Sequence, residues 1–331
     1  MTDLPAAFDR QMPPPQSAQI NGIGMTWYED GPKDAPAIVL CHGFPETAFS
    51  WRWQIPALAE AGYRVIVPDQ RGYGLTEAPP AVTDYDMAHL TGDLVGLLDH
   101  LKIDKAVFCG HDWGGIVVWQ MPLMHPDRCA GIIGLNTPFM RRYPIDPIEV
   151  FRKAFGPDMY IVWFQTPDEP EAVLGADVEK TMRFFMRKPA AVRDAGEAPK
   201  EGGSSFAFGQ ALAHYDPAND PNQFLSDEDM AVFVALFQRS GFRGGVNWYR
   251  NFSRNWQASA DLPTRIDGLP CLMIMAEKDA VLSPAMADGM EEVISDLEKV
   301  LVTGSGHWTQ QEKPEAVNGF IIDWMRRRFL A

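Results

Sequence analysis

The sequence has no hydrophobic run long enough to cross a bilayer, few cysteines, and a shortage of positive charge. A transmembrane helix needs about 20 consecutive apolar residues, and the 331 residues contain no such stretch, so we expect no membrane insertion. Lysine and arginine number 29 against 44 aspartates and glutamates, which gives a net charge of −15. Nucleic acids and anionic membranes repel an acidic surface, so we expect neither as a partner. A local basic pocket remains compatible with these totals.

The four cysteines (Cys41, Cys109, Cys129 and Cys271) all fall within short apolar runs. None has a metal-ligand spacing such as Cys-x-x-Cys, so we expect buried, reduced thiols in a cytoplasmic protein. Three consecutive prolines, Pro13 to Pro15, stand where a signal peptide would need an apolar run. We therefore expect no export.

What is present is a balanced α/β pattern. Short apolar runs alternate with longer amphipathic segments, which is typical of a mostly parallel sheet covered by helices. The predicted strands are Ala37–Cys41, Val65–Pro68, Ala106–Cys109, Gly131–Leu135, Leu272–Met275 and Val300–Val302. The predicted helices are Trp51–Ala61, Met87–Leu101, Gly115–Met124, Pro284–Leu297 and Pro314–Phe329, with Asp86 and Ser283 as N-caps.

One long internal segment breaks this alternation. Between about residues 139 and 258 the chain is helical in character, broken by proline and rich in aromatic residues, and strands resume near Leu269. We therefore divide the chain into a core of residues 1–138 and 259–331 and a helical cap of residues 139–258. The cap is expected over the carboxyl edge of the sheet, where open α/β sheets bind ligands. Most of its aromatic residues are expected in its own core, and residues 195–205 in an exposed loop.

The segment Gly110-His-Asp-Trp-Gly114 stands where an apolar strand runs into a helical segment. This is the frame of the nucleophile elbow, Gly-x-Ser-x-Gly, with Asp112 in place of serine. Its glycines tolerate the strained angles of a sharp turn. A carboxylate can attack an sp³ carbon directly and form an ester with the enzyme, so Asp112 predicts chemistry on epoxides or alkyl halides. Taken alone, the pentapeptide would more often mark an aspartate that caps the next helix.

Two further residues stand where the partners of an elbow nucleophile are expected, in the order acid and then histidine. Asp279 closes the apolar run that begins at Cys271, and His307 lies in a glycine-flanked loop after the last predicted strand. Separately, Asp279 could cap a helix, His307 could be a surface residue, and Glu277 is a competing acid. Their order and their positions at strand ends predict a triad with Asp112.

The segment His42-Gly-Phe-Pro45 ends an earlier strand. In this kind of fold that turn supplies one backbone N–H of an oxyanion hole, and the residue after the nucleophile supplies the other. We therefore predict an oxyanion hole from Phe44 and Trp113, and a cis Phe44–Pro45 bond, although the motif alone would also suit an ordinary turn. His111 and Asp112 are adjacent and cannot easily reach one ion, so we predict no metal site.

These motifs together resemble those of the α/β-hydrolase-fold epoxide hydrolases, close to the soluble, cytosolic type. The likeness covers most of the chain from about residue 20 and includes the cap. It rests on His42-Gly-Phe-Pro-Glu46, Gly72-Tyr-Gly-Leu-Thr76, Gly110-His-Asp-Trp-Gly-Gly115, Asn136-Thr-Pro138, Ala276-Glu-Lys-Asp279 and Gly306-His-Trp-Thr-Gln310. The resemblance implies an α/β-hydrolase fold with an inserted helical cap. It also implies that Asp112 is the nucleophile, His307 the base and Asp279 its partner.

The family also uses two cap tyrosines as acids during ring opening. The segments Asn247-Trp-Tyr-Arg-Asn251 and Tyr160-Ile-Val-Trp-Phe-Gln165 look like those of the family, so we assign Tyr249 and Tyr160 to this role. Tyr143 and Tyr215 are the cap tyrosines left over, and Ile161 departs from the polar residue expected beside Tyr160. The residues that we expect to line the substrate pocket are His42, Pro45, Trp163, Phe164, Trp248 and Trp308.

The two tyrosines favour an epoxide oxygen over a halide as the leaving group. Opening an epoxide produces an alkoxide far more basic than a phenolate, and a tyrosine O–H with a pKa near 10 can donate as that charge develops. Such a proton transfer contributes roughly 10²–10⁴-fold. A halide needs only N–H donors, and Phe44 offers no side-chain donor. We predict hydrolysis of a small hydrophobic epoxide to a vicinal diol, without a metal or organic cofactor.

Two alternatives remain open. The first is a haloalkane or haloacid dehalogenase with the same triad, although haloacid relatives carry arginine after the nucleophile where this chain has Trp113. The second is a non-catalytic ligand-binding protein of the same fold, in which a triad, an oxyanion turn and two tyrosines would be surplus. A homodimer is a possible assembly.

Overall fold

The computed structural model describes residues 4–188 and 206–329, and a mixed sheet lies at the centre of this part of the chain. Its order is β1-β2-β4-β3-β5-β6-β7-β8. Strand β2 pairs antiparallel with β1 and β4, and the remaining neighbours pair in parallel. The strands are β1 (Gln16–Ile20), β2 (Ile23–Asp30), β3 (Ala37–Cys41), β4 (Arg64–Pro68), β5 (Ala106–His111), β6 (Cys129–Leu135), β7 (Cys271–Ala276) and β8 (Leu297–Val302).

Helices connect these strands and cover the sheet. The helices of the core are α1 (Ala6–Gln11), α2 (Gln54–Glu60), α3 (Met87–Leu101), α4 (Trp113–Met124), α13 (Thr309–Glu312) and α14 (Pro314–Phe329). Between β6 and β7 lie α5 (Pro147–Phe155), α6 (Tyr160–Trp163), α7 (Glu169–Gly175), α8 (Val178–Phe185), α9 (Phe208–His214), α10 (Asp227–Ser240), α11 (Arg243–Arg250) and α12 (Phe252–Ala258). Short 3₁₀ turns are η1 (Ala48–Trp51), η2 (Val82–Tyr85), η3 (Pro126–Arg128), η4 (Pro217–Asn219), η5 (Pro284–Ala287) and η6 (Met290–Glu292).

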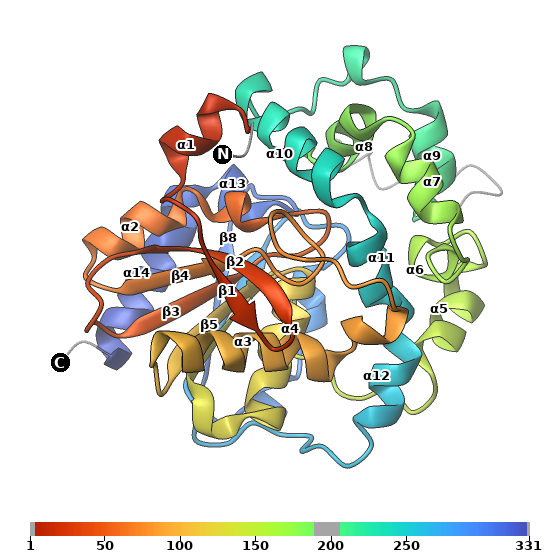
Figure 1. Cartoon of the computed structure of the whole chain (residues 1–331). Coiled ribbons are helices and arrows are strands. Elements are labelled where there is room, and N and C mark those ends of the chain that lie inside the picture. Colours follow the sequence, from red (N-terminus) through yellow and green to blue (C-terminus); the bar gives the residue numbers. More distant parts are fainter. Residues whose placement is uncertain (1–3, 189–205, 330–331) are drawn as a thin grey trace.

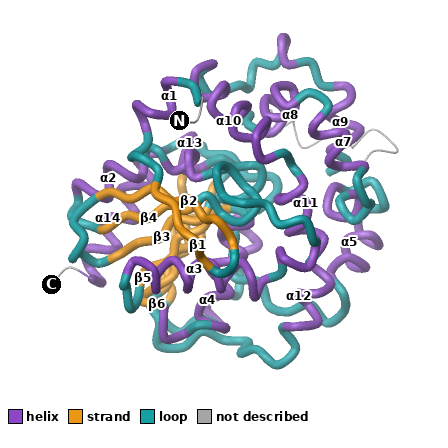
Figure 2. The backbone as a smooth tube through the Cα atoms, in the orientation of Figure 1, coloured by secondary structure: helices purple, strands orange, loops and turns teal. Residues whose placement is uncertain are grey.

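The sheet is a buried middle layer. Helices α3 and α4 pack together on one face, and α2 and α14 pack together on the other (Figure 1). Every residue of β3, β4 and β5 is buried, as parallel strands covered on both faces require. The helices between β6 and β7 are gathered to one side of the sheet (Figure 2). They meet the core along the side on which Asp112 follows β5.

The predicted fold class, a mostly parallel sheet with helices on both faces, is confirmed. Each of the six predicted strands corresponds to one of β3 to β8, and the bounds differ by at most three residues. Asp86 is an N-cap as predicted, since its carboxylate accepts a hydrogen bond from the His89 N–H at 3.1 Å. The apolar runs of buried strands were the strongest signal in the sequence.

The local structure differs from the expectations in three places. Strands β1 and β2 were not predicted; β1 is a mostly exposed edge strand, Gln-Ser-Ala-Gln-Ile, without an apolar run. The helix predicted over Pro284–Leu297 is absent from the structure, which has η5, η6 and the start of β8 there. Within the segment 284–297, Gly289 adopts a φ of 79°, which is not helical. The Ser283 side chain, predicted as an N-cap, makes no capping hydrogen bond. Helix α2 begins at Gln54 rather than Trp51, because η1 occupies the preceding residues. The loop predicted at 195–205 lies outside the described residues.

Candidate active site

Asp112 stands at the turn between β5 and α4, with a φ of 51° and a ψ of −121°. A positive φ at a residue other than glycine costs on the order of 1–3 kcal/mol, and close packing of glycine backbones holds the turn in place. A Cβ on Gly110 would lie 2.1 Å from the carbonyl oxygen of Gly114, and one on Gly43 would lie 2.4 Å from the Asp112 Cβ. The small residues of the elbow are therefore required by the packing that presents Asp112.

The oxyanion turn faces the same carboxylate. The Phe44 N–H donates to the Asp112 Oδ1 at 2.8 Å, and the Phe44–Pro45 bond is cis, as predicted. Burial raises the pKa of Asp112, while the charge of His307 and the N–H groups of Phe44 and Trp113 oppose that rise. The two backbone donors predicted for an oxyanion hole thus both act on the carboxyl group of Asp112.

His307 joins the two carboxylates. Its Nδ1 lies 2.8 Å from the Asp279 Oδ2, and its Nε2 lies 3.7 Å from the Asp112 Oδ2. The other oxygen of Asp279 accepts the N–H groups of Val281 at 2.8 Å and Leu282 at 3.0 Å. Asp279 is therefore fully hydrogen-bonded, which fixes the orientation of the imidazole. The competing acid Glu277 instead accepts the Gly304 N–H.

These contacts set the charges of the triad. Burial alone would lower the pKa of His307, but the charge of Asp279, the hydrogen bond to it and the charge of Asp112 raise the pKa to about 9. Burial would raise the pKa of Asp279, but His307, the Leu282 N–H and Asn136 hold it well below its ordinary value. At neutral pH the free protein therefore carries a protonated His307 between two carboxylates.

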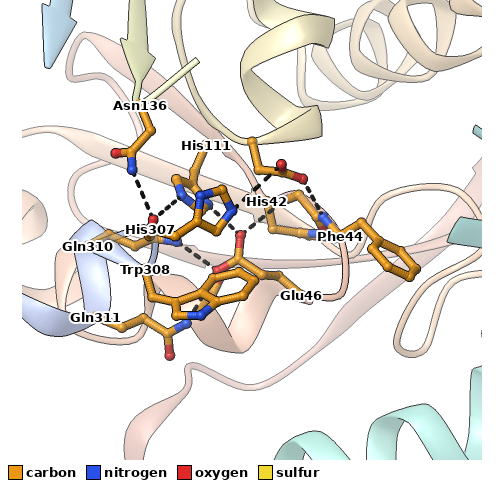
Figure 3. A network of polar contacts seen from close by, with 12 residues as sticks. His42, Phe44, Glu46, His111, Asn136, His307, Trp308, Gln310 and Gln311 are labelled. Atoms are coloured by element: carbon orange, nitrogen blue, oxygen red, sulfur yellow. Dashed lines mark hydrogen bonds and ion pairs between the residues drawn. The ribbon is translucent and has the colours of Figure 1, made fainter. Parts of the chain in front are cut away.

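A buried network of polar contacts holds the loop that carries His307 (Figure 3). The Asn136 amide donates to the Asp279 Oδ2 at 2.7 Å and to the His307 carbonyl at 3.0 Å, and Asn136 itself has a φ of 61°. The same carbonyl lies 2.7 Å from the His111 Nε2. The backbone of His307 is thus tied both to Asn136, at the end of β6, and to His111, the residue before Asp112.

Glu46 lies at the centre of that network. Its side chain is fully buried, with its Oε2 2.7 Å from the His111 Nδ1 and 3.1 Å from the Gly43 N. Its Oε1 accepts the amides of Gln310 at 2.8 Å and Gln311 at 3.2 Å. Burial would raise the pKa of Glu46, but His111 and the Gly43 N–H hold it below the ordinary value. One carboxylate therefore connects the oxyanion turn, the elbow and the base loop.

Tyr160 and Tyr249 lie close together at the cavities that contain Asp112. Tyr160 lies on α6 and Tyr249 on α11, with ring centroids 5.7 Å apart, and both line the cavities that contain Asp112. The Tyr249 ring is edge-on to Trp113 at 5.1 Å, and the Tyr160 ring stacks on Phe208 at 4.4 Å. Burial, and then the charge of Asp112, raises the pKa of both tyrosines, so both hydroxyls keep their protons.

Helix α11 is held closely against the core. A Cβ on Gly244 would lie 2.4 Å from the carbonyl oxygen of Gly72, so the two backbones touch without side chains between them. One turn later, the Trp248 indole donates to the Arg71 carbonyl at 3.1 Å. These two contacts fix the height of Tyr249 above the sheet.

Two cavities meet at Asp112, Tyr160, Tyr249 and Val281. One has a volume of about 240 Å³ and is otherwise lined by Phe44, Phe184, Phe185, Arg187, Lys188, Phe208, Lys278, Asp279, Ala280, His307 and Trp308. The other has a volume of about 340 Å³ and is lined mainly by apolar side chains from α4, α5, α12 and the loops around them. We call them the first arm and the second arm. The site is a bent cavity with the carboxylate at the bend.

One of the six residues predicted to line the substrate pocket lines an arm of the cavity. Trp308 lines the first arm, but the other five predicted lining residues, His42, Pro45, Trp163, Phe164 and Trp248, line neither arm. Phe164 is buried behind Tyr249, with their rings 5.0 Å apart, and the Trp163 indole bonds to Glu169 at 3.2 Å. His42 is fully buried, accepts the Gln70 N–H at 3.0 Å and has its pKa lowered to about 4 by burial.

The cavities also locate the remaining cap residues. Tyr143 and Ile161 line the second arm, so the residue that departs from the family pattern makes this arm more apolar. Tyr215 lies away from the bend and donates to Asp220 at 3.0 Å. Phe184, Phe185 and Phe208 were not chosen as lining residues from the sequence, where they stand among many cap aromatics.

The described residues, 4–188 and 206–329, contain neither a metal-ligand cluster nor a membrane-spanning helix. No group of three or more His, Cys, Asp or Glu side chains there is arranged to hold a metal ion. None of the helices in this described part is long and apolar enough for a membrane span. All four cysteines are buried as free thiols.

Comparison with known proteins agrees with this geometry. Residues 36–314 match the model of the alpha/beta hydrolase fold family. The chain is 43% identical over 314 residues to epoxide hydrolase A of Mycobacterium tuberculosis, a match that covers 92% of this chain and 95% of that protein. It is also 40% identical over 307 residues to bifunctional epoxide hydrolase 2 of Sus scrofa, covering 92% of this chain and 53% of the relative. The chain thus spans about half the length of that bifunctional protein.

A solved structure of an epoxide hydrolase is also similar to this chain. The crystal structure of epoxide hydrolase A from Mycobacterium thermoresistibile superposes with a TM-score of 0.86 at 40% sequence identity, covering 95% of this chain and 98% of that one. Sequence and fold therefore agree over nearly the whole length, cap helices included. The chain belongs to the epoxide hydrolases of the α/β-hydrolase fold.

Proposed function

We propose that this protein hydrolyses epoxides to vicinal diols through an ester of Asp112. The observation that carries the proposal is the position of Tyr160 and Tyr249 over the Asp112 carboxylate, within the cavities that meet there. A carboxylate nucleophile below two proton donors suits a strained ring whose oxygen must be protonated as it leaves. The names of the relatives point to the same reaction.

In the first half of the proposed reaction, Asp112 attacks one ring carbon and the C–O bond to that carbon breaks. The electron pair passes to the ring oxygen, and a tyrosine hydroxyl supplies the proton. Because burial and the charge of Asp112 raise the pKa of Tyr160 and Tyr249, each hydroxyl is protonated when the substrate arrives. Two donors also hold the ring oxygen in one place, which orients the carbon for attack.

In the second half, water attacks the carbonyl carbon of the ester. His307 takes one proton of the water, Asp279 stabilises the imidazolium, and the N–H groups of Phe44 and Trp113 receive the developing oxyanion. The bond between the ester carbon and the substrate oxygen then breaks, that oxygen leaves with the remaining proton of the water as the second hydroxyl of the diol, and the Asp112 carboxylate is restored. Ester formation removes the negative charge of Asp112, which is one of the charges that raise the His307 pKa. Loss of this charge lowers the His307 pKa, so the imidazolium releases its proton, which restores the tyrosine hydroxyl, and a neutral imidazole is present to act as the base when water attacks.

The halide alternative finds less support in the donors around the cavity. A halide leaving group would need N–H donors that are free to point at it. The Trp308 indole, which lines the first arm, donates to the Phe185 carbonyl at 2.8 Å, and the Trp248 indole donates to Arg71. The Trp113 indole, which lines the second arm beside Asp112, interacts with the Tyr249 side chain. Each of these indoles therefore has a partner within the protein, which together with the two tyrosine hydroxyls above Asp112 favours an epoxide over an alkyl halide.

A paired assay tests the proposal. Purified protein is given styrene oxide in one reaction and a bromoalkane in another, with diol measured by chromatography and bromide by ion analysis. Diol without bromide is expected. Bromide release without diol would replace the proposal with a dehalogenase, and no turnover of either would favour a non-catalytic binding protein. The Asp112→Ala variant controls for uncatalysed hydrolysis.

We also propose that residues 139–258 form a lid over a core of residues 1–138 and 259–331. The contacts that support it are those of both arms, where residues of α6, α8 and α11 face residues that follow β5, β7 and β8. We propose in addition that the protein is cytoplasmic and that it forms a homodimer. Cell fractionation and analytical ultracentrifugation test these two points.

A further inference from the structure

The peptide group that joins His307 to Trp308 is held at both of its polar atoms. Its carbonyl oxygen lies 2.7 Å from the His111 Nε2 and accepts the Asn136 amide at 3.0 Å (Figure 3). Its N–H, which belongs to Trp308, donates to the Glu312 Oε1 at 3.1 Å. Three side chains, from the end of β5, from the residue after β6 and from α13, therefore fix the plane of one peptide. Because this peptide is bonded to the His307 Cα, fixing its plane restricts the direction in which the imidazole can point.

Glu312 also contacts the backbone on the other side of His307. Its second carboxylate oxygen, Oε2, accepts the Gly306 N–H at 3.0 Å. One carboxylate thus accepts the N–H groups of the residues before and after the base. An ionised carboxylate has lone pairs for both bonds, and hydrogen bonds to a charged acceptor are stronger than those between neutral groups. Glu312 therefore joins the two ends of the tripeptide that has His307 at its centre.

The turn that carries Glu312 is itself anchored. The Glu312 N–H donates to the Trp308 carbonyl at 2.8 Å, so the backbone and the side chain of Glu312 bond opposite ends of the same residue. The two residues before it, Gln310 and Gln311, donate their amides to the buried carboxylate of Glu46. The position of the Glu312 carboxylate is thus set by contacts of α13 with the core as well as by the loop that it holds.

The two halves of the proposed reaction differ in how much they need an oriented His307. In the first half Asp112 attacks the ring, and the His307 Nε2 lies 3.7 Å from its carboxylate without a hydrogen bond. In the second half the imidazole must meet the water that attacks the ester. Asp279 holds the ring at Nδ1, and the backbone must hold the other end of the residue. A displaced His307 backbone should therefore slow the second half and spare the first.

We propose that Glu312 is a positioning residue for hydrolysis of the ester. Its carboxylate holds the N–H groups of Gly306 and Trp308, and through them it keeps the imidazole of His307 directed at the attacking water. The inference rests on the proposed reaction through an Asp112 ester. Loss of the carboxylate lowers the rate at which water removes the ester and leaves the rate of ester formation unchanged.

Three substitutions grade the loss of the carboxylate. Glu312→Ala removes both acceptors, Glu312→Gln keeps one acceptor oxygen and turns the other into a donor, and Glu312→Asp keeps both oxygens on a shorter side chain. Single turnovers of styrene oxide, quenched rapidly and analysed by intact-protein mass spectrometry, measure formation and hydrolysis of the ester separately. We expect hydrolysis to slow on the order of 10- to 100-fold in Glu312→Ala and by less in Glu312→Gln, while formation stays within about twofold. Glu312→Asp should recover part of the loss.

Steady-state kinetics provide a second measurement. When hydrolysis of the ester slows, alkylated protein accumulates during turnover, so kcat and KM should fall together. The fraction of alkylated protein at steady state should rise in the same order as the loss of rate, from Glu312→Asp to Glu312→Ala. Far-UV circular dichroism checks folding, and the Gln variant carries the test if the Ala variant does not fold.

The matched control is Glu277→Ala. Glu277 accepts the Gly304 N–H at 2.7 Å, so this substitution removes the same kind of contact from the same loop, but not from the residues that flank His307. Both rates should stay within about twofold of the wild-type values, as is usual for exposed positions.

The other outcomes would each overturn the proposal. An equal loss in Glu277→Ala, or formation that slows as much as hydrolysis in Glu312→Ala, would show a general loosening of the loop. A raised KM with both single-turnover rates unchanged would assign Glu312 to the placement of Trp308 in the first arm. If the wild type forms no ester with styrene oxide, the proposed function fails first, and the role of Glu312 fails with it.

Discussion

The Nε2 of His307 lies 3.7 Å from the Asp112 Oδ2, beyond hydrogen-bond distance, whereas its Nδ1 is 2.8 Å from Asp279. A serine nucleophile needs its proton removed and therefore hydrogen-bonds to its base. A carboxylate nucleophile has no proton for a base to remove, so the first half of the proposed reaction requires no such bond. In the proposed mechanism, Asp112 reacts with the ring and His307 acts afterwards on the ester.

This division predicts that the ester accumulates when the base is removed. The His307→Gln variant should be alkylated by substrate and then stop, because water is no longer activated. Intact-protein mass spectrometry should show an increase of one substrate mass, located by peptide mapping at Asp112. Asp112→Ala should show neither adduct nor turnover. An unmodified mass in a folded His307→Gln protein would contradict covalent catalysis.

The tyrosines should share one task. Tyr160→Phe and Tyr249→Phe should each lower the rate of ring opening, and the double variant should lose most of the roughly 10²–10⁴-fold that proton transfer contributes. The readout is the single-turnover alkylation rate in a His307→Gln background, which isolates the first half. Tyr215→Phe is the matched control, since its hydroxyl bonds Asp220 away from the bend. Wild-type rates in the double variant would show that other groups are the acids.

The sequence was informative where function depends on a short motif at a strand end. Asp112, Asp279 and His307 could be chosen because each follows an apolar strand, and a parallel sheet brings such ends together. The residues lining the pocket could not, because which helix side faces Asp112 depends on how α6, α8, α9 and α11 pack on one another. Trp163 and Phe164 belong to the same segment as Tyr160 yet line neither arm, whereas Phe208, far along the chain, stacks on Tyr160.

The buried hydrogen-bond network around Glu46 could not be predicted from the sequence either, although its members belong to recognisable motifs. Glu46 and His111 are separated by 65 residues, and nothing in either motif states that they pair. Likewise β1 could not be found, because a polar edge strand is defined by its hydrogen bonds to β2 rather than by an apolar run. Local sequence patterns do not predict which polar groups will pair when they are far apart in the chain.

The Glu46 network should contribute to stability more than surface ion pairs do. Glu46→Ala leaves His111 and the two glutamine amides without their buried acceptor, which we expect to cost about 3–5 kcal/mol in the free energy of unfolding. Glu46→Gln keeps the volume and an acceptor oxygen and should cost less. Glu298→Ala, which removes a partly exposed partner of Arg327 and Arg328, should cost about 1 kcal/mol or less. Urea unfolding followed by tryptophan fluorescence measures all three, and equal losses for Glu46→Ala and Glu298→Ala would refute the expectation.

The charges around His307 predict how it titrates. Its pKa is raised from 6.5 to about 9, with Asp279 the largest contributor to the rise and Asp112 a smaller one. The stabilisation this provides is fully present below pH 6.5 and is lost as the pH rises through about 9. Asp279→Asn should lower the His307 pKa most, and Asp112→Asn, which mimics the uncharged ester, should lower it by less. NMR titration of the imidazole signals measures this, and an unchanged pKa in Asp112→Asn would contradict the proposed activation of the base by ester formation.

The oxygen atoms of the product distinguish two routes to the same diol. If His307 activated water for direct attack on the ring, the oxygen added to the product would come from solvent in every turnover. If Asp112 attacks, the first oxygen delivered is one of its own carboxylate oxygens, and water only refills the carboxyl group. A single turnover in H₂¹⁸O with enzyme in excess should therefore give mostly unlabelled diol, with the label in the peptide that contains Asp112.

We expect the carboxylate route because of where the two residues stand. Asp112 is at the apex of the elbow, at the bend where both arms of the cavity meet and below Tyr160 and Tyr249. His307 is held on its far side by Asp279 and reaches toward the Asp112 carboxylate rather than past it. A second turnover should then release labelled diol, because the refilled carboxylate delivers solvent oxygen. Fully labelled diol in the first turnover would instead establish direct attack by water.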